Sequence, residues 1–160
     1  MIGMTASDLL SLLKEKKLTL SLAESCTGGM ISSHIVDIPG SSECFLGSAV
    51  TYSNEAKMSL LGVKPETLNQ YGAVSRETSV EMATGCVRLF KTDIAASVTG
   101  IAGPGGATET KPVGTVWMSV TDGSRCISAE HHFKGSRQEI REQSALSVIS
   151  MIEDFIRGIL

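Results

Sequence analysis

The sequence predicts an α/β fold in which a mixed β-sheet of about five strands is covered by helices. The first part of the chain alternates segments of helical and strand-like apolar spacing, as parallel strands joined by helices do. Later, Asp122-Gly123 separates two strand-like segments, which is the pattern of a β-hairpin. Parallel strands followed by an antiparallel hairpin give a mixed sheet.

Size and composition agree with such a fold. The 160 residues suffice for one domain, which we expect to span residues 1–160. A chain of this length buries about 68–70% of its unfolded surface, so folding requires neither disulfides nor a structural metal. With 42% hydrophobic and 19% charged residues, the composition excludes a disordered segment.

The first three elements follow from apolar spacing and end signals. Residues 5–17 form a helix that begins with Thr5 and Asp8 and carries four leucines on one face. Residues 18–23 alternate apolar and small polar side chains, as a strand does. Residues 30–37 form a second helix, which the following Pro-Gly pair ends.

The middle of the chain predicts one strand and three helices. Residues 45–52 form the strand, after which Ser53 or Asn54 caps a short helix. Residues 65–72 form a further helical turn that begins with proline. A longer helix follows Ser75, and its apolar face is predicted to consist of Val80, Ala83, Val87 and Phe90.

The last part of the chain begins with a compact strand at residues 94–99 and a loop with four glycines at residues 100–112. The two hairpin strands follow at residues 113–120 and 125–133. A capping box, Ser136-x-x-Glu139, opens a helix that runs to the C-terminus. The inward face of this helix is predicted to consist of Ile140, Ser144, Val148, Met151, Ile152, Phe155 and Ile159.

Several classes of protein are disfavoured. The net charge is −3 and no basic stripe is present, which argues against nucleic acid as a partner. No apolar stretch approaches the ~18 residues of a membrane span, and since the first residues have no basic n-region we expect no secretory leader. The cysteines form no Cys-x-x-Cys pair, so no zinc site is expected. Scattered cysteines in a chain with an adequate core predict reduced thiols and a cytoplasmic protein. These cysteines are Cys26, Cys44, Cys86 and Cys126.

Ligands of α/β sheets bind where loops leave the carboxyl ends of the strands. Three loops qualify, 24–29, 52–57 and 100–111, together with the turn Gly135–Arg137. These four segments are therefore the places in which to look for functional side chains.

The first of these loops places hydroxyl and thiol groups between a strand end and a helix start. Ser25, Cys26 and Thr27 lie there, and backbone N–H groups at a helix start can hold a phosphate or an oxyanion. Gly28 and Gly29 allow a close approach to a ligand. Alternatively, Ser25 or Thr27 is only a helix cap and the glycines only assist packing.

The second loop offers a base. A serine nucleophile needs one, and a lysine serves when burial lowers its pKa. Lys57 is the candidate, with Tyr52 available to relay or orient the proton. The alternative is a solvated lysine beside an aromatic residue at a strand end.

The two remaining segments suit an anionic ligand. The glycine-rich run that starts at Thr99 and Gly100 can wrap a ligand with backbone N–H groups, or it is only a flexible connection. Arg137 lies at the start of the last helix, where a cation is unfavourable unless an anion lies between. A solvent-exposed arginine is the alternative.

Five motifs, in order, resemble the CinA C-terminal domain family over essentially the whole chain. The motifs are Ala23–Gly29, Val50–Lys57, Gly72–Ser75, Thr99–Gly106 and Lys111–Val116. The resemblance implies a three-layer α/β/α sandwich, here in a stand-alone form without the additional N-terminal domain of larger relatives. It also implies hydrolysis of the carboxamide of nicotinamide mononucleotide to nicotinic acid mononucleotide and ammonia, without metal or cofactor.

The same resemblance assigns roles to residues. Ser25 would be the nucleophile and Lys57 the general base, with Tyr52 beside them. Substrate contacts would come from the loops and from the start of the last helix, and a homodimer or larger homo-oligomer would be expected. Of the substrate-binding residues, the resemblance itself places Arg137 in the site. From the loops considered above we expect the others to be Thr27, Gly28, Gly29, Thr99 and Gly100.

Other functions stay open at this point. A domain that binds a nucleotide or a partner protein without catalysis is the first alternative, and it would release no ammonia. A cysteine amidase with Cys26 as nucleophile is the second, since a helix start lowers the pKa of a thiol. Direct DNA binding ranks last because of the negative net charge.

Overall fold

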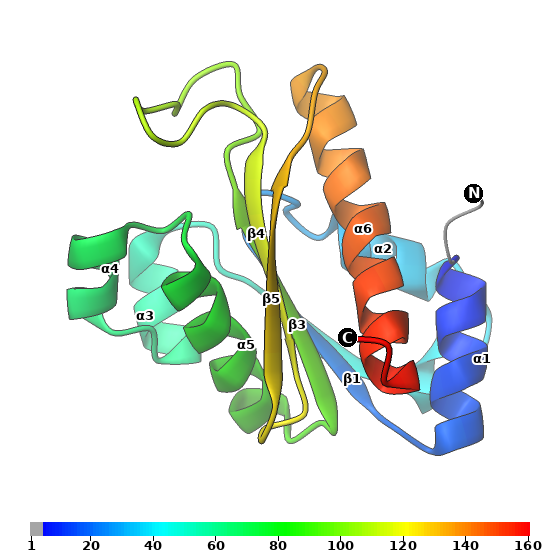
Figure 1. Cartoon of the computed structure of the whole chain (residues 1–160). Coiled ribbons are helices and arrows are strands. Elements are labelled where there is room, and N and C mark those ends of the chain that lie inside the picture. The colour runs from blue at the N-terminus through cyan, green and yellow to red at the C-terminus, as the bar shows by residue number, and fades with distance from the viewer. Residues whose placement is uncertain (1–4) are drawn as a thin grey trace.

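The structure, a computed structural model, describes residues 5–160 and contains a five-stranded mixed sheet (Figure 1). Its strands are β1 (Leu20–Glu24), β2 (Phe45–Val50), β3 (Ile94–Gly100), β4 (Thr115–Thr121) and β5 (Cys126–His132). The strand order is β2-β1-β3-β4-β5. The strand β1 pairs in parallel with β2 and β3, whereas β3–β4 and β4–β5 are antiparallel. The predicted mixed sheet and late hairpin are confirmed.

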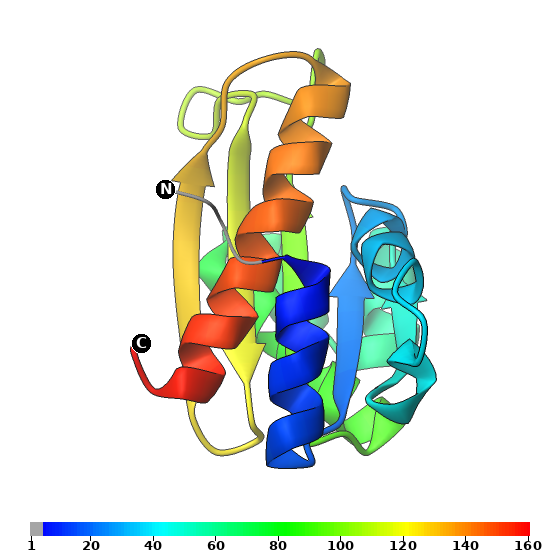
Figure 2. The ribbon, with the colours of Figure 1, turned by 90° about the vertical axis from the view of Figure 1, so that its right-hand side faces the viewer.

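Helices cover both faces of this sheet, which gives three layers (Figure 1, Figure 2). One face carries α1 (Ala6–Lys16), α2 (Met30–Val36) and α6 (Arg137–Arg157). The other carries α3 (Asn54–Leu61), α4 (Pro65–Tyr71) and α5 (Arg76–Phe90). A short 3-10 helix, Ser41–Glu43, precedes β2. The fold is the expected α/β/α sandwich.

Local signals define where the helices begin and end. Thr5 with Asp8, and Ser136 with Glu139, form the two predicted capping boxes. Ser53, not Asn54, caps α3, because its hydroxyl accepts the N–H of Ala56. These caps fix the start of α3 and of α6, the two helices that bring side chains to the edge of the sheet described below.

Two apolar clusters join the layers. The larger fills the space between the sheet and α1, α2 and α6, and the leucines predicted on one face of α1 are buried there. The smaller lies between the sheet and α3 and α5. Since both faces of the sheet are covered, β1 and β3 are buried along their whole length except for Gly100 at the end of β3.

Two predicted faces differ from the structure. On α5, Val80, Val87 and Phe90 are only half-buried, whereas the polar residues Thr78 and Ser79 are buried. Ser79 shows the reason, since its hydroxyl lies 2.6 Å from that of Ser119 and a paired hydroxyl can be buried. On the last helix, the inward position predicted for Ile159 is wrong. The helix ends at Gly158, which leaves Ile159 68% exposed.

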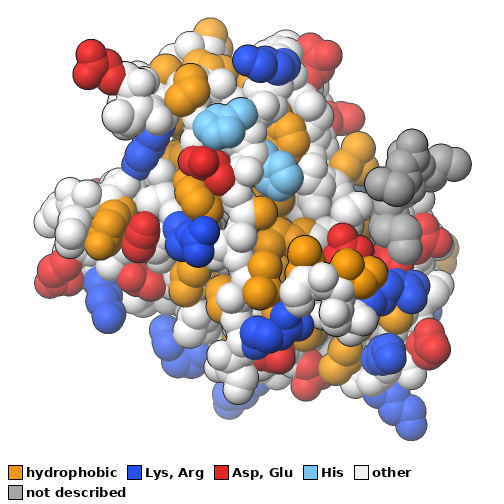
Figure 3. Space-filling model, in the orientation of Figure 1, with side chains coloured by type: hydrophobic (Ala, Val, Ile, Leu, Met, Phe, Trp, Pro, Cys, Tyr) orange, Lys and Arg blue, Asp and Glu red, His pale blue; other side chains and the backbone are white. Residues whose placement is uncertain are grey.

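Across residues 5–160, no helix is long and apolar enough to cross a membrane. Over the face shown in Figure 3, basic and acidic side chains are interspersed and form no continuous basic patch.

Candidate active site

The carboxyl ends of the parallel strands meet at one edge of the sheet. There β1 ends at Glu24, β2 at Val50 and β3 at Gly100, and α6 begins beside them. The four segments singled out in the sequence meet here, and between them lies a cavity of ≈ 260 Å³. Its lining comes from all four segments and from the loop before α5: Ser25, Cys26, Tyr52, Asn54, Lys57, Ala73, Val74, Thr99, Gly100, Ile101, Ala102, Gly103, Gly105, Gly106 and Arg137.

At this cavity the structure joins Ser25 and Lys57. The Nζ atom of Lys57 lies 2.9 Å from Oγ of Ser25. Both residues are buried, since Lys57 is only 1% exposed and Ser25 only 7%. Ser25 directly follows β1, and its N–H still donates to Val98 of β3. Lys57 lies in the first turn of α3. Two residues 32 positions apart in the sequence therefore form one buried hydrogen-bonded pair.

Burial shifts the ionisation of Lys57 toward the neutral amine, because it lowers the pKa of the ammonium group below the ordinary value of 10.5. Besides Ser25, Nζ contacts two backbone carbonyls, Thr51 O at 2.8 Å and Tyr52 O at 3.3 Å. A neutral amine has two N–H bonds and one lone pair. When the two carbonyls accept both N–H bonds, the lone pair is left to accept the Ser25 hydroxyl proton.

Glu24 organises the loop that carries Ser25, and sequence reasoning missed it. Its fully buried carboxylate accepts the N–H groups of Gly29, Ile31 and Ser32 and the Ser32 hydroxyl, at 2.6–3.1 Å. This carboxylate therefore caps α2, and neither Ser25 nor Thr27 does so. The available signal was an acidic residue at the end of an apolar strand, directly before a serine and a pair of glycines.

Tyr52 and Arg137 meet at the mouth of the cavity. Tyr52 is 64% exposed, and its phenol oxygen accepts a hydrogen bond from Arg137 Nη2 at 3.2 Å. Arg137 Nη1 donates to the carbonyl of Gly103 at 2.7 Å. Tyr52 reaches Lys57 only through its main-chain carbonyl, so the proton relay through the phenol expected from the sequence has no contact to carry it.

Thr99 and Gly100 line the cavity, as expected. The Thr99 hydroxyl is buried and donates to the carbonyl of Ala73 at 2.9 Å, which joins the Gly72–Ser75 motif to this edge. At Gly100, a Cβ atom would lie 2.9 Å from the carbonyl oxygen of Thr115. Close packing against β4 is thus sufficient reason for a glycine at this position.

Three residues expected to contact substrate do not line the cavity. Thr27 is fully buried, and its hydroxyl has no hydrogen-bond partner among the described residues. Gly28 donates its N–H to the carbonyl of Ser25, and Gly29 donates to Glu24. The backbone N–H groups of these two glycines are already occupied, so their predicted contact with substrate has no support in this geometry.

Cys26 differs from the expectation for a nucleophile. Burial raises the pKa of its thiol to about 11, the opposite of the lowering that a helix start would produce. The reason is its position, because α2 begins four residues later and Glu24 occupies the N–H groups there.

Within residues 5–160, no three His, Cys, Asp or Glu side chains are grouped to hold a metal ion.

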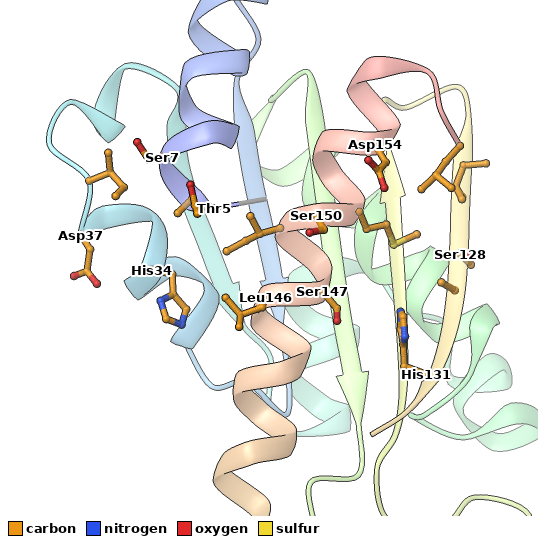
Figure 4. A pocket seen from close by; sticks show the side chains of 17 residues that line it. Thr5, Ser7, His34, Asp37, Ser128, His131, Leu146, Ser147, Ser150 and Asp154 are labelled. Carbon is orange, nitrogen blue, oxygen red and sulfur yellow. The ribbon is translucent and has the colours of Figure 1, made fainter. Parts of the chain in front are cut away.

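A second, larger groove of ≈ 810 Å³ lies along α6, bounded by α1, α2 and β5 (Figure 4). It contains hydroxyl groups, among them Ser147 and Ser150, and two histidines, His34 and His131, which lie on opposite sides of α6. No serine–histidine or serine–lysine hydrogen bond is found among its described residues, so it lacks the pairing of the smaller cavity.

The fold and the site define a class of protein, an α/β/α sandwich with a buried serine–lysine pair at the carboxyl edge of its sheet. Residues 4–156 match the family model described as the CinA C-terminal domain. The chain belongs to the CinA C-terminal domain family.

Curated relatives support this membership. A CinA-like protein from Endomicrobium trichonymphae is 52% identical over 141 residues, which are 88% of this chain and 33% of the relative. A CinA-like protein from Fervidobacterium nodosum is 49% identical over 149 residues, 93% of this chain and 36% of the relative. The chain thus spans about a third of the length of these relatives.

Solved structures share the fold. The competence/damage inducible protein CihA from Agrobacterium tumefaciens superposes with a TM-score of 0.90 at 38% identity, over 92% of this chain and 91% of that one. A CinA superfamily protein from Klebsiella pneumoniae 700603 gives a TM-score of 0.93 at 29% identity, over 96% of both chains.

Proposed function

We propose that this chain is a serine–lysine amidase that hydrolyses the carboxamide of nicotinamide mononucleotide to nicotinic acid mononucleotide and ammonia. The observation that carries the proposal is the 2.9 Å contact between Ser25 Oγ and a buried Lys57 whose pKa is lowered. The substrate follows from the family resemblance. We further propose that residues 1–160 act as one cytoplasmic domain and assemble as a homodimer or larger homo-oligomer.

The first step forms an acyl-enzyme. The neutral amine of Lys57 takes the Ser25 hydroxyl proton while Oγ attacks the carboxamide carbon. The new C–O bond displaces the carbonyl π-electrons onto oxygen, which gives a tetrahedral oxyanion that backbone N–H groups beside Ser25 stabilise. The Lys57 ammonium then protonates the amide nitrogen, the C–N bond breaks and ammonia leaves.

The second step regenerates the enzyme. Lys57, again neutral, removes a proton from a water molecule that attacks the ester carbon. The C–O bond to Ser25 breaks, its oxygen is reprotonated by Lys57, and the carboxylic acid product releases its remaining proton to solvent and leaves as the carboxylate. One base thus serves both halves of the reaction, as the single buried lysine requires.

The nucleotide end of the substrate extends toward Arg137. The cavity of ≈ 260 Å³ is smaller than the roughly 300–1,000 Å³ typical of ligand pockets. The pyridine ring and its carboxamide therefore enter it, and the phosphate lies at its mouth. Arg137 is exposed there, with Thr99 and Gly100 on the adjoining wall. A guanidinium group is well suited to a phosphate.

Ammonia release from nicotinamide mononucleotide, measured in EDTA, tests the proposal. We expect release by the wild type, a loss of about 10³-fold or more in Ser25→Ala, and full activity in Ser147→Ala, the matched serine variant of the larger groove. Activity retained by Ser25→Ala would refute the assigned nucleophile. Nucleotide binding without ammonia release by folded wild type would instead favour a binding domain.

A further inference from the structure

Arg141 contacts the loop after Ser25 in a way that the proposed reaction does not yet use. It lies one helical turn after Arg137 on α6. Its Nε atom donates to the carbonyl of Cys26 at 3.1 Å, and its Nη2 atom donates to the carbonyl of Thr27 at 2.9 Å. The remaining Nη1 atom donates to Gln138 on the same helix at 3.2 Å. One guanidinium group thus holds two successive carbonyls of the loop.

Most N–H groups of this loop are occupied. Gly28 donates to the carbonyl of Ser25, and Gly29 donates to Glu24. Among the described residues, the N–H groups of Cys26 and Thr27 donate to no oxygen atom. Of these two residues only Cys26 lines the cavity, because Thr27 is fully buried. The Cys26 N–H group, directly after the proposed nucleophile, is therefore the one available to bind an oxyanion.

The loop is held from both faces of the sheet. Arg141 reaches the carbonyls of Cys26 and Thr27 from α6, on one face. Lys57 reaches Ser25 from α3, on the other face. The Cys26 N–H group lies in the backbone between these contacts, so its position depends on both.

We propose that Arg141 is a positioning residue that holds the loop after Ser25 so that the Cys26 N–H group binds the oxyanion of the tetrahedral intermediate. The role is geometric. By holding the carbonyls of Cys26 and Thr27, Arg141 fixes the backbone that carries this N–H group. A donor fixed in advance stabilises the oxyanion without reorganisation during the reaction. This inference rests on the proposed amidase function.

The test compares the amide substrate with its thioamide analogue in the full chain. Sulfur accepts hydrogen bonds weakly, so a defective oxyanion site slows the amide more than the thioamide. In Arg141→Met we expect kcat for nicotinamide mononucleotide to fall about 30- to 100-fold with KM changed less than about 3-fold, since removal of one oxyanion donor costs about 10²–10³-fold. For the thioamide we expect a fall of less than about 5-fold, and an intermediate loss in Arg141→Lys, which cannot hold both carbonyls.

Arg125→Met is the matched control. Arg125 also donates to two carbonyls, those of Phe155 and Leu160, but it lies in the hairpin at the opposite edge of the sheet. Its loss should leave the amide-to-thioamide rate ratio unchanged.

Three results would overturn the inference. Equal losses on both substrates, unchanged kcat, or failure of both Arg141 variants to fold would show at most a structural role for Arg141. The proposed function itself is checked separately by the wild type and by Ser25→Ala. An inactive wild type overturns both proposals, whereas an active wild type with an unchanged rate ratio in Arg141→Met overturns only the role of Arg141.

Discussion

The small cavity at the carboxyl edge and the larger groove along α6 differ in what their polar groups contact. The groove is three times as large and contains serines and histidines, yet no hydrogen bond joins them among the described residues. In the cavity, Lys57 contacts Ser25 and two carbonyls, and Glu24 and Arg141 hold the neighbouring backbone. The comparison teaches that buried polar groups with specified partners, not volume, distinguish the candidate active site.

The largest effect is expected from Lys57→Met. Because the proposed base is lost, kcat/KM should fall about 10²–10⁴-fold, measured by ammonia release. Lys64→Met, at an exposed lysine before α4, is the control and should be fully active. A Lys57→Met enzyme with more than a tenth of wild-type activity would remove the distinction between the cavity and the groove.

The wild-type pH profile sharpens the same point. Burial lowers the pKa of Lys57, so its neutral, proton-accepting form grows as pH rises. Log kcat/KM should therefore increase with pH and level off above one apparent pKa that lies below 10.5. A profile that is flat or falls from neutral to alkaline pH contradicts a lysine base.

Gly85→Ala tests whether the position of α3 matters. A Cβ atom at Gly85 of α5 would lie 1.8 Å from the carbonyl oxygen of Leu61, at the end of α3. The helix that carries Lys57 must then shift, and we expect a stability loss of about 3 kcal/mol with reduced activity. Chemical denaturation measures the first effect. Thr84→Ala, at an exposed position of the same helix, is the control and should change neither the stability nor the activity. A Gly85→Ala variant as stable as the wild type would contradict the close packing of α5 against α3.

Glu24→Gln should have an intermediate effect on stability. The amide NH₂ group cannot accept the N–H bonds that the carboxylate accepts at α2, so one or two buried donors lose their partner. We expect a loss of about 2 kcal/mol in urea denaturation. Glu15→Gln, at an exposed position of α1, serves as the comparison and should be nearly neutral. Equal stability of the two variants would argue against the capping role.

The smallest effect is expected in the groove. Leu146 is 52% exposed there, so Leu146→Ala should change stability by less than about 0.5 kcal/mol and leave ammonia release unchanged. A tenfold loss of activity would show that the groove and the cavity are coupled, and the contrast between them would need revision.

Sequence reasoning was most successful for features with local causes. Capping residues and apolar spacing gave the helices and strands, and the four segments that meet at the edge follow from where parallel strands end. It was less successful where a side chain has a distant partner. The buried face of α5 depends on Ser79 meeting Ser119, and the alternative interpretations of Ser25 and Lys57 stayed open until a family resemblance favoured one.

By itself, therefore, the sequence determined the α/β class, the order of elements and the loops in which function was to be sought, because these depend on neighbours along the chain. Only the tertiary structure decided that Lys57 is buried against Ser25 and that Glu24 rather than a hydroxyl caps α2. It also decided that Arg141 holds the loop that joins Ser25 to α2. Burial and hydrogen bonding are set by groups that folding brings together from distant positions. The same residues in another fold would have other pKa values and other partners.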